Sequence, residues 1–233
     1  MAVIAKPQSI SSHWYTNKGT AAHKQPKANG DGERSTTIRD ARRLSLLPSV
    51  TNVLGVLSKG GLINWQLNQV GLAAHGNPPT EGESADYYAK RIVAKSKEST
   101  DDAADMGSKI HKAIEDHYDG NEVEEGMSPY VLPVVAWQES KGLKFIERET
   151  ILANSERGYA GMCDVVGLGS ANQMFIIDWK TRKTDPKKKV KSYETELLQV
   201  AAYAASRWGE KAIMDRQVHG ATVYVSRNEV GRV

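Results

Sequence analysis

Apolar residues change their spacing once along this chain of 233 residues, close to Gly142. After Gly142 they alternate with polar residues, which is typical of strands, whereas before it they recur every three to four residues, as in amphipathic helices. Helices are expected over 49–57, 62–70, 84–97, 101–118, 129–141 and 193–208. Strands are expected over 145–154, 158–168, 174–180 and 220–226. The order predicts an α/β (α+β) protein with a central mixed β-β-β-α-β sheet flanked by helices and an N-terminal helical region.

The amino-terminal part differs in composition from the rest. Residues 1–47 are rich in Lys, Ser, Thr, Asn and Gly and hold few large apolar residues. We expect a basic, partly flexible segment there, with a flexible loop over 18–37. Residues 48–233 are then predicted to form a single domain, with a helical part over 48–142 and a sheet core over 143–233.

The formal net charge of +3 conceals three charge blocks. Residues 1–48 carry a net charge of +5, residues 80–125 one of −7, and residues 182–191 one of +5. Such blocks are usually solvated surface, but they also let a nearly neutral chain present a basic face to a polyanion. Charge alone leaves both interpretations open.

Composition disfavours several classes of protein. No apolar run approaches the roughly 18 residues that a membrane helix needs. The start MAVIAKP is too short, and too soon broken by proline, for a secretory signal. The single cysteine, Cys163, excludes an internal disulfide, a cysteine-rich zinc site and a cysteine-ligated iron–sulfur cluster. We therefore expect a cytoplasmic protein without a membrane partner.

The most informative segment is a predicted hairpin that carries two carboxylates and a lysine. Asp164 lies on its first strand and Asp178 near the end of its second, with a loop over 169–173 between them. If the loop is centred on Ala171, paired residues have numbers that sum to 342, and Asp164 lies opposite Asp178. Lys180, two residues further on, shares their face of the sheet.

Two carboxylates directly opposite each other repel, so such a pair needs a positive charge between them. A divalent cation bound by oxygen ligands is the obvious candidate, since it polarises a phosphate and lowers the pKa of a bound water. The lysine would orient the nucleophile or stabilise developing charge. The alternative is an ordinary hairpin whose polar ends reach solvent. The apolar run at 175–177 disfavours it, because such a run is typical of a central strand.

These residues belong to an ordered set of motifs that resembles the PD-(D/E)XK nuclease superfamily, and within it the RecB-like exonuclease branch. Four segments carry the resemblance: GSKIH at 107–111, GMCD at 161–164, DWK at 178–180 and QVAAY at 199–203. Each is weak alone, but their order and spacing resemble those of the branch. The segment after Pro48 also resembles phage exonucleases and the mitochondrial genome maintenance exonuclease.

The resemblance implies a restriction-endonuclease-like core and a metal-dependent DNA exonuclease. Such an enzyme hydrolyses phosphodiester bonds, here on single-stranded DNA or strand ends, in the replication, recombination or repair of bacterial or phage DNA. The resemblance also implies Mg²⁺ or Mn²⁺ as cofactor and a catalytic lysine, Lys180. The implied metal ligands are His111, Asp164, Asp178 and the Trp179 carbonyl. A histidine beside hard oxygen ligands suits Mn²⁺ better than Mg²⁺.

The other motif residues leave alternatives open. Without the resemblance, His111 is better explained as a packed or surface histidine beside a buried helix stripe. Gln199 and Tyr203 share a helix face and would act at the catalytic site by contacting the substrate backbone or orienting the lysine. A buried tyrosine with a polar neighbour explains them equally well. Glu149, on the preceding strand, is a further candidate acid for the same site, and Glu147 and Glu115 compete for that role.

Six basic residues follow the lysine closely and are candidates for binding DNA phosphates. They are Arg182, Lys183, Lys187, Lys188, Lys189 and Lys191. Tyr159, Trp179 and Tyr193 are candidates for stacking on unpaired bases.

Two other functions compete with the exonuclease: a structure-specific or restriction-type endonuclease, and a catalytically inactive nucleic-acid-binding module. The chain also differs from relatives that carry an iron–sulfur cluster on four cysteines, and it has no nucleotide-binding P-loop sequence.

Overall fold

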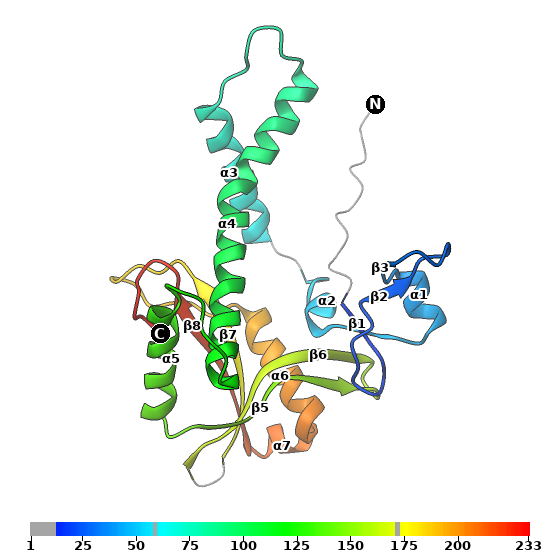
Figure 1. Ribbon diagram of the computed structural model, residues 1–233, viewed down its shortest axis with the longest axis vertical. Coiled ribbons are helices and arrows are strands. Elements are labelled where there is room, and N and C mark those ends of the chain that lie inside the picture. The colour runs from blue at the N-terminus through cyan, green and yellow to red at the C-terminus, as the bar shows by residue number, and fades with distance from the viewer. Residues whose placement is uncertain (1–12, 58–59, 171–172) are drawn as a thin grey trace. The chain divides into compact units, whose positions relative to one another are not determined.

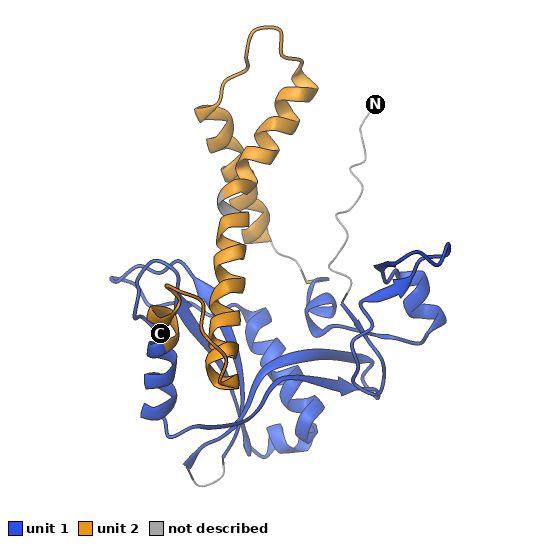
Figure 2. Ribbon diagram, viewed as in Figure 1, with its two compact units in different colours: residues 1–56, 132–233 blue, residues 57–131 orange. Residues whose placement is uncertain are grey.

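The computed structural model describes residues 13–57, 60–170 and 173–233 (Figure 1). The chain forms two compact units (Figure 2). The first consists of residues 1–56 and 132–233, and the second of residues 57–131. No helix in the described part is long and apolar enough to cross a membrane.

A four-stranded sheet forms the centre of the first unit, in the order β5-β6-β7-β8. Its strands are β5 (Lys144–Asn154), β6 (Tyr159–Leu168), β7 (Met174–Arg182) and β8 (Val218–Ser226). β5, β6 and β7 are antiparallel neighbours, whereas β7 and β8 are parallel. A parallel pair needs a long crossover, and here α6 (Glu194–Trp208) and α7 (Glu210–Met214) supply it. The predicted mixed sheet and the α+β class are confirmed.

The register between β6 and β7 is the predicted one. Val165 is paired with Ile177, and Val166 with Ile176, so the residue numbers sum to 342. The paired residues end with Val165 and Ile177. Asp164 and Asp178 are the next residues beyond this last pair, one on each strand. The predicted hairpin register is confirmed, but the ladder ends one pair short of the predicted Asp164–Asp178 pair.

Helix α6 packs on one face of this sheet. Its buried residues recur at helical spacing: Glu196, Gln199, Val200, Tyr203 and Ala204. Val200, Tyr203 and Ala204 join a core cluster with Val50, Leu152, Cys163, Val166 and Ile176. Gly220 on β8 lets the helix approach closely, because a Cβ added there would lie 2.9 Å from the Val200 Cγ2 atom.

The amino-terminal part of the first unit contains regular secondary structure where composition favours a loop. It comprises β1 (Trp14–Tyr15), β2 (Lys24–Pro26), β3 (Glu33–Ser35), α1 (Ile38–Arg43), β4 (Leu47–Pro48) and α2 (Val50–Leu54). β2 pairs with β3, and β1 with β4. The hairpin escapes sequence-based prediction because its strands are short and largely exposed and lack apolar alternation.

The second unit contains α3 (Gly60–Gly76), α4 (Ala85–Asp119) and the start of α5 (Ser128–Ser140). The two helices expected over 84–97 and 101–118 are one continuous helix, α4. The prediction of a break is wrong because no glycine or proline lies between residues 85 and 106. Leu62, Trp65 and Leu67 on α3 have the spacing of a buried helix face, but their exposed fractions are 46%, 43% and 64%.

Candidate active site between two diverging strands

Strands β6 and β7 separate next to the two aspartates. Beyond Val165 and Ile177, β6 continues only beside β5, and β7 only beside β8. We call the space between the separated strands the fork. The Asp164 side chain crosses it, and its Oδ2 atom accepts a hydrogen bond of 2.7 Å from the Trp179 N–H. A carboxylate thus takes the place of a backbone partner where the ladder ends.

The β5–β6 pair is irregular near Asp164, with a register shift between Phe145 and Glu147. Cys163 and Val166 both belong to the core cluster that contacts α6, although they are three residues apart. Regular strands alternate every two residues and cannot place both on one face. Across the β5–β6 pair, Glu149 has a left-handed φ of 43°, which is uncommon for a residue with a side chain. The expected alternation therefore breaks at the position of Asp164.

The second carboxylate, Asp178, is held from two sides. It is only 1% exposed. Gln199 Nε2 donates to its Oδ1 atom at 3.0 Å, and the Lys180 ammonium lies 2.5 Å from its Oδ2 atom. Gln199 Nε2 also lies 3.1 Å from the Tyr203 hydroxyl oxygen, which accepts from it. The Gln-x-x-x-Tyr motif thus positions an aspartate rather than the lysine.

Gly161 explains why the tyrosine can reach this position. A Cβ atom at residue 161 would lie 2.7 Å from Tyr203 Cε1, closer than two carbon atoms can approach without displacement. Glycine inside a strand commonly marks such a close approach. Each motif of the first unit that the sequence singled out therefore has a physical role: Gly161 makes room for Tyr203, which contacts Gln199, which holds Asp178.

Two of the titratable groups at the fork, Asp164 and Tyr203, have raised pKa values. Burial raises the pKa of Asp164 to about 6, although the Trp179 N–H and the nearby Lys180 charge act in the opposite direction. Burial also raises the pKa of Tyr203, against the effect of its bond with Gln199. Tyr203 is therefore a protonated hydroxyl at neutral pH. Asp164 changes its charge between about pH 5 and 7.

The groups around the fork suit a hard divalent cation. Asp164 and Asp178 offer carboxylate oxygens, and in a strand the Trp179 carbonyl points to the same side as its N–H, toward Asp164. Mg²⁺ is commonly held by one or two carboxylates, with waters and substrate phosphate oxygens completing its shell. Within the described residues, no three His, Cys, Asp or Glu side chains form a metal-binding group. The first unit thus contributes two carboxylates and a carbonyl.

His111, the remaining predicted ligand, lies on α4 in the second unit. It is partly buried. The role of His111 as a ligand stays a prediction.

The predicted aromatic contacts are not all accessible. The Trp179 side chain is 3% exposed, and its ring centroid lies 5.9 Å from those of Trp137 and Phe145. The prediction that it stacks on a base is wrong, because the indole is part of the core. Tyr193 is 62% exposed, but one face of its ring carries the Arg182 guanidinium at 4.1 Å.

The six predicted phosphate-binding residues fall into two groups. Arg182 forms an ion pair with the buried Glu196, and its Nη1 atom donates to the Lys191 carbonyl at 3.3 Å. These contacts attach the end of β7 to α6. The five lysines that follow are exposed on the loop after β7: Lys183, Lys187, Lys188, Lys189 and Lys191. Lys188 lies 3.3 Å from Asp185, an exposed pair that leaves its charge accessible.

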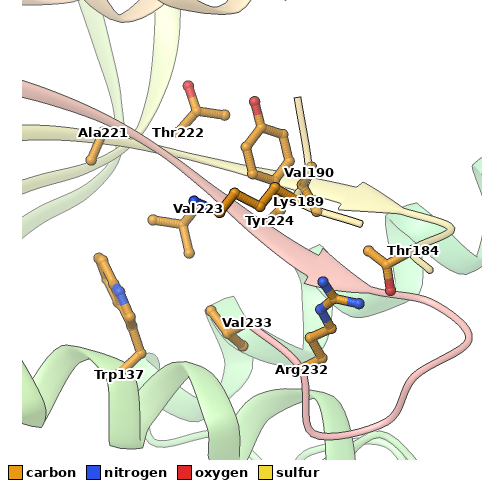
Figure 3. Close-up of a pocket in the computed structure, with 10 residues that line it drawn as sticks. All are labelled: Trp137, Thr184, Lys189, Val190, Ala221, Thr222, Val223, Tyr224, Arg232 and Val233. Atoms are coloured by element: carbon orange, nitrogen blue, oxygen red, sulfur yellow. The ribbon is translucent and has the colours of Figure 1, made fainter. Parts of the chain in front are cut away.

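A pocket of about 400 Å³ lies beside β8, on the sheet edge opposite β5 (Figure 3). Residues 221–224 form one wall, and Trp137, Thr184, Lys189, Val190, Arg232 and Val233 complete the lining. Lys189 is the one predicted site residue among them. Neither Asp164 nor Asp178 lines this pocket, so it is distinct from the fork.

No family model matches this chain, and a search of curated proteins finds no match. The nuclease resemblance therefore rests on the four motifs, and three of them meet in the geometry of the fork.

Proposed function

We propose that the protein is a metal-dependent deoxyribonuclease that hydrolyses phosphodiester bonds, acting as an exonuclease on single-stranded DNA or strand ends. The observation that carries this proposal is the convergence of Asp164, Asp178 and Lys180 where β6 and β7 separate. The Trp179 N–H bond fixes Asp164, and the Gln199 and Lys180 contacts fix Asp178. Fixed carboxylates and a fixed cation are what stabilisation of a developing phosphate charge requires.

The two aspartates and the Trp179 carbonyl would hold Mg²⁺ or Mn²⁺. When bound, the cation would lower the pKa of a water and offset charge on the phosphate. Lys180, whose side chain is 29% exposed, is the group of this set that can reach both Asp178 and a substrate in the fork. Its ammonium would stabilise charge that develops on the phosphate oxygens, and Asp178 holds it in place.

Two protonation states follow from the fork. Asp164 must lose its proton to bind a cation, and because burial raises its pKa, cation binding should weaken as the pH falls. Tyr203 keeps its proton, since its pKa is raised by burial. Its oxygen accepts the Gln199 bond, which keeps the amide aimed at Asp178.

The test is a time course of cleavage of single- and double-stranded DNA labelled at the 5′ or the 3′ end, with Mn²⁺, with Mg²⁺ and with EDTA. We expect metal-dependent release of short products. Lys180→Ala should abolish cleavage. Lys211→Ala is the matched control, because Lys211 also pairs with an aspartate, Asp215, but on the exposed surface of α7. Cleavage in EDTA, or undiminished cleavage by Lys180→Ala, would contradict the proposal.

Covalently closed single-stranded circles separate an exonuclease from an endonuclease. An exonuclease leaves the circle intact and degrades the same DNA once it is linearised. Cutting of the circle would replace the exonuclease by a structure-specific or restriction-type endonuclease. Binding of DNA without cleavage under any metal condition would leave the inactive nucleic-acid-binding module instead.

A further inference from the structure

Residues 13–48 form a small folded module with a strong positive charge, which we call the basic module. It carries seven Lys or Arg residues against three Asp or Glu residues, a net charge of +4. The module contains β1 to β4 and α1 and belongs to the same unit as the sheet. Composition alone does not tell whether this segment folds, and the structure makes it a defined surface.

Internal contacts hold the module rigid. Thr37 caps α1 in a reciprocal capping box with Asp40. Asp40 also accepts two hydrogen bonds from Arg34, one of them 2.9 Å long. The buried Thr36 donates to the Ala22 carbonyl at 2.6 Å and links α1 to the segment before β2. The positive side chains on α1 therefore extend from a fixed scaffold.

Three exposed arginines lie on one face of α1: Arg39, Arg42 and Arg43. Their spacing of three and four residues makes them neighbours on a helix, and like charges at this spacing repel. Arg39 lies in the first turn, where the helix dipole disfavours a cation. Only Arg43 has an acidic partner in the described chain, Asp40 at 3.6 Å, and Asp40 already binds Arg34. The dipole favours Arg42 and Arg43 in the last turn but not Arg39, and an anionic partner would offset the repulsion among all three.

The basic module also contains a stacked pair of histidine rings. The ring centroids of His13 and His23 are 4.7 Å apart, with 28° between the planes. His13 is exposed, and its carbonyl accepts the Ser49 N–H at 3.0 Å. The His23 carbonyl accepts the Thr36 N–H at 2.9 Å, one residue before the cap of α1. An exposed ring is thus held in the same folded module as the three arginines.

The electrostatics of this ring pair suit a neutral stacking surface. Burial and the neighbouring His13 ring both lower the pKa of His23, so His23 is uncharged at neutral pH. A neutral ring supports a second ring by stacking, without repelling it. Phosphate-binding cations beside an exposed aromatic ring are the combination by which proteins bind unpaired nucleic-acid strands.

The basic module is attached to the strand that carries Asp164. Ser49, directly after β4, forms a parallel bridge with Ala160 on β6. Ala160 precedes Asp164 by four residues, which corresponds to about 13 Å along a strand. The module is thus joined to the strand that carries the proposed catalytic aspartate.

We propose that the basic module is a second binding site for single-stranded nucleic acid, with backbone phosphates on Arg39, Arg42 and Arg43 and an unpaired base on the His13 ring. The site rests on the proposed nuclease function for its substrate class. It adds to that function a contact away from the reacting phosphate. The module would hold the strand during successive cleavage steps.

The test is equilibrium binding of a labelled oligothymidylate of 30 nucleotides, measured by fluorescence anisotropy in EDTA over a range of salt concentrations. EDTA prevents cleavage, so binding is measured separately from catalysis. The first variant replaces all three α1 arginines by Gln. Its matched control replaces three exposed lysines that lie outside the basic module but in the same unit by Gln: Lys141, Lys144 and Lys211. The second variant is His13→Ala.

Each variant has a distinct expected signature. Each phosphate contact on a single strand contributes about 0.7 to the slope of log K against log salt, so the arginine variant should flatten the slope by about 2. Its affinity near 100 mM salt should fall by at least tenfold. His13→Ala should weaken binding by about tenfold without changing the slope, because stacking carries no counterion release. The control triple variant should keep an affinity within about threefold of the wild type.

Two results would overturn the inference. The first is that the arginine variant and His13→Ala both bind the oligothymidylate like the wild type. The second is that the control variant loses as much affinity as the arginine variant. Failure of the nuclease function appears differently. A chain that never cuts DNA but shows arginine- and His13-dependent binding keeps the second site and rejects only the nuclease. A chain that cuts DNA, while both variants bind normally, rejects only the second site.

Discussion

Replacement of Asp164 by Asn should stabilise the protein at neutral pH. Asn keeps an oxygen that can accept the Trp179 N–H bond, but it carries no charge to be buried. The pKa of Asp164 is raised from 3.8 to about 6, mainly by burial. Because each pKa unit corresponds to 1.36 kcal/mol, this carboxylate destabilises the folded state by about 3 kcal/mol once it is ionised.

The sign of this effect follows from linkage. Since the pKa is higher in the folded state than in the unfolded state, the folded protein binds more protons between about pH 4 and pH 6. The contribution of Asp164 to the free energy of unfolding of the wild type is therefore complete below about pH 4 and is lost as the pH rises through 6. Asp164→Asn does not suffer this loss. Its gain in the free energy of unfolding should be about 3 kcal/mol at pH 7.5, about 1.6 at pH 5 and about 0.6 at pH 4.

Urea denaturation of both proteins at these three pH values, in EDTA, measures the difference. Asp31→Asn is the matched control, because Asp31 is exposed in the β2–β3 hairpin and its substitution should change stability little at any pH. A gain that is absent at pH 7.5, or the same at all three pH values, would refute the argument from burial. On the proposed function, the stabilised variant should also lose cleavage activity.

Three further predictions concern the same site. Gly161→Ala should lower the free energy of unfolding by about 1–3 kcal/mol, because the added Cβ would meet Tyr203. The control, Gly71→Ala on α3, should raise the free energy of unfolding by about 0.5–1 kcal/mol, because the space around Gly71 is open. Thermal unfolding measures both changes, and equal effects of the two variants would contradict the proposed packing. Lys180→Met should lower it by about 1–3 kcal/mol, because the buried Asp178 carboxylate loses its cation; unchanged urea midpoints would contradict this. The rate kcat/KM at limiting Mn²⁺ should fall about tenfold per unit below pH 6 as Asp164 gains a proton, and a profile flat down to pH 5 would contradict it.

Much of the fold is predictable from local patterns. The alternation after Gly142 predicts all four strands of the sheet, and the centre of one loop predicts the β6–β7 register. Register follows from so little information because a tight hairpin links the two strands, and a shift by one residue would turn every side chain to the other face. That register places both aspartates next to the end of the ladder, but the strands separate there, so the predicted direct pairing of Asp164 with Asp178 does not form.

The details of the site depend on contacts that sequence patterns do not contain. The break in alternation at Cys163 and the left-handed φ of Glu149 are properties of the paired strands, so the direction of Asp164 cannot be read from β6 alone. Arg182 illustrates the same limit. A basic residue beside a catalytic lysine suggests a phosphate contact, but its partner, Glu196, lies 14 residues away on α6.

The amino-terminal basic module is missed for a different reason. Its stability comes from polar contacts, such as the Arg34–Asp40 pair and the Thr37 cap, rather than from an apolar period. Methods that rest on hydrophobic spacing find no pattern in such a segment. Side-chain capping and ion pairing are recognisable in the sequence only once the turn that brings them together is known.

The most direct test of the central claim is the single-turnover rate of cleavage of end-labelled single-stranded DNA by the wild type and by Lys180→Ala, in Mn²⁺ and in EDTA. We predict cleavage by the wild type in Mn²⁺ alone, and a rate at least a hundredfold lower for Lys180→Ala under the same conditions. Equal rates for the two proteins would contradict the account, and so would complete absence of cleavage by the wild type in Mn²⁺.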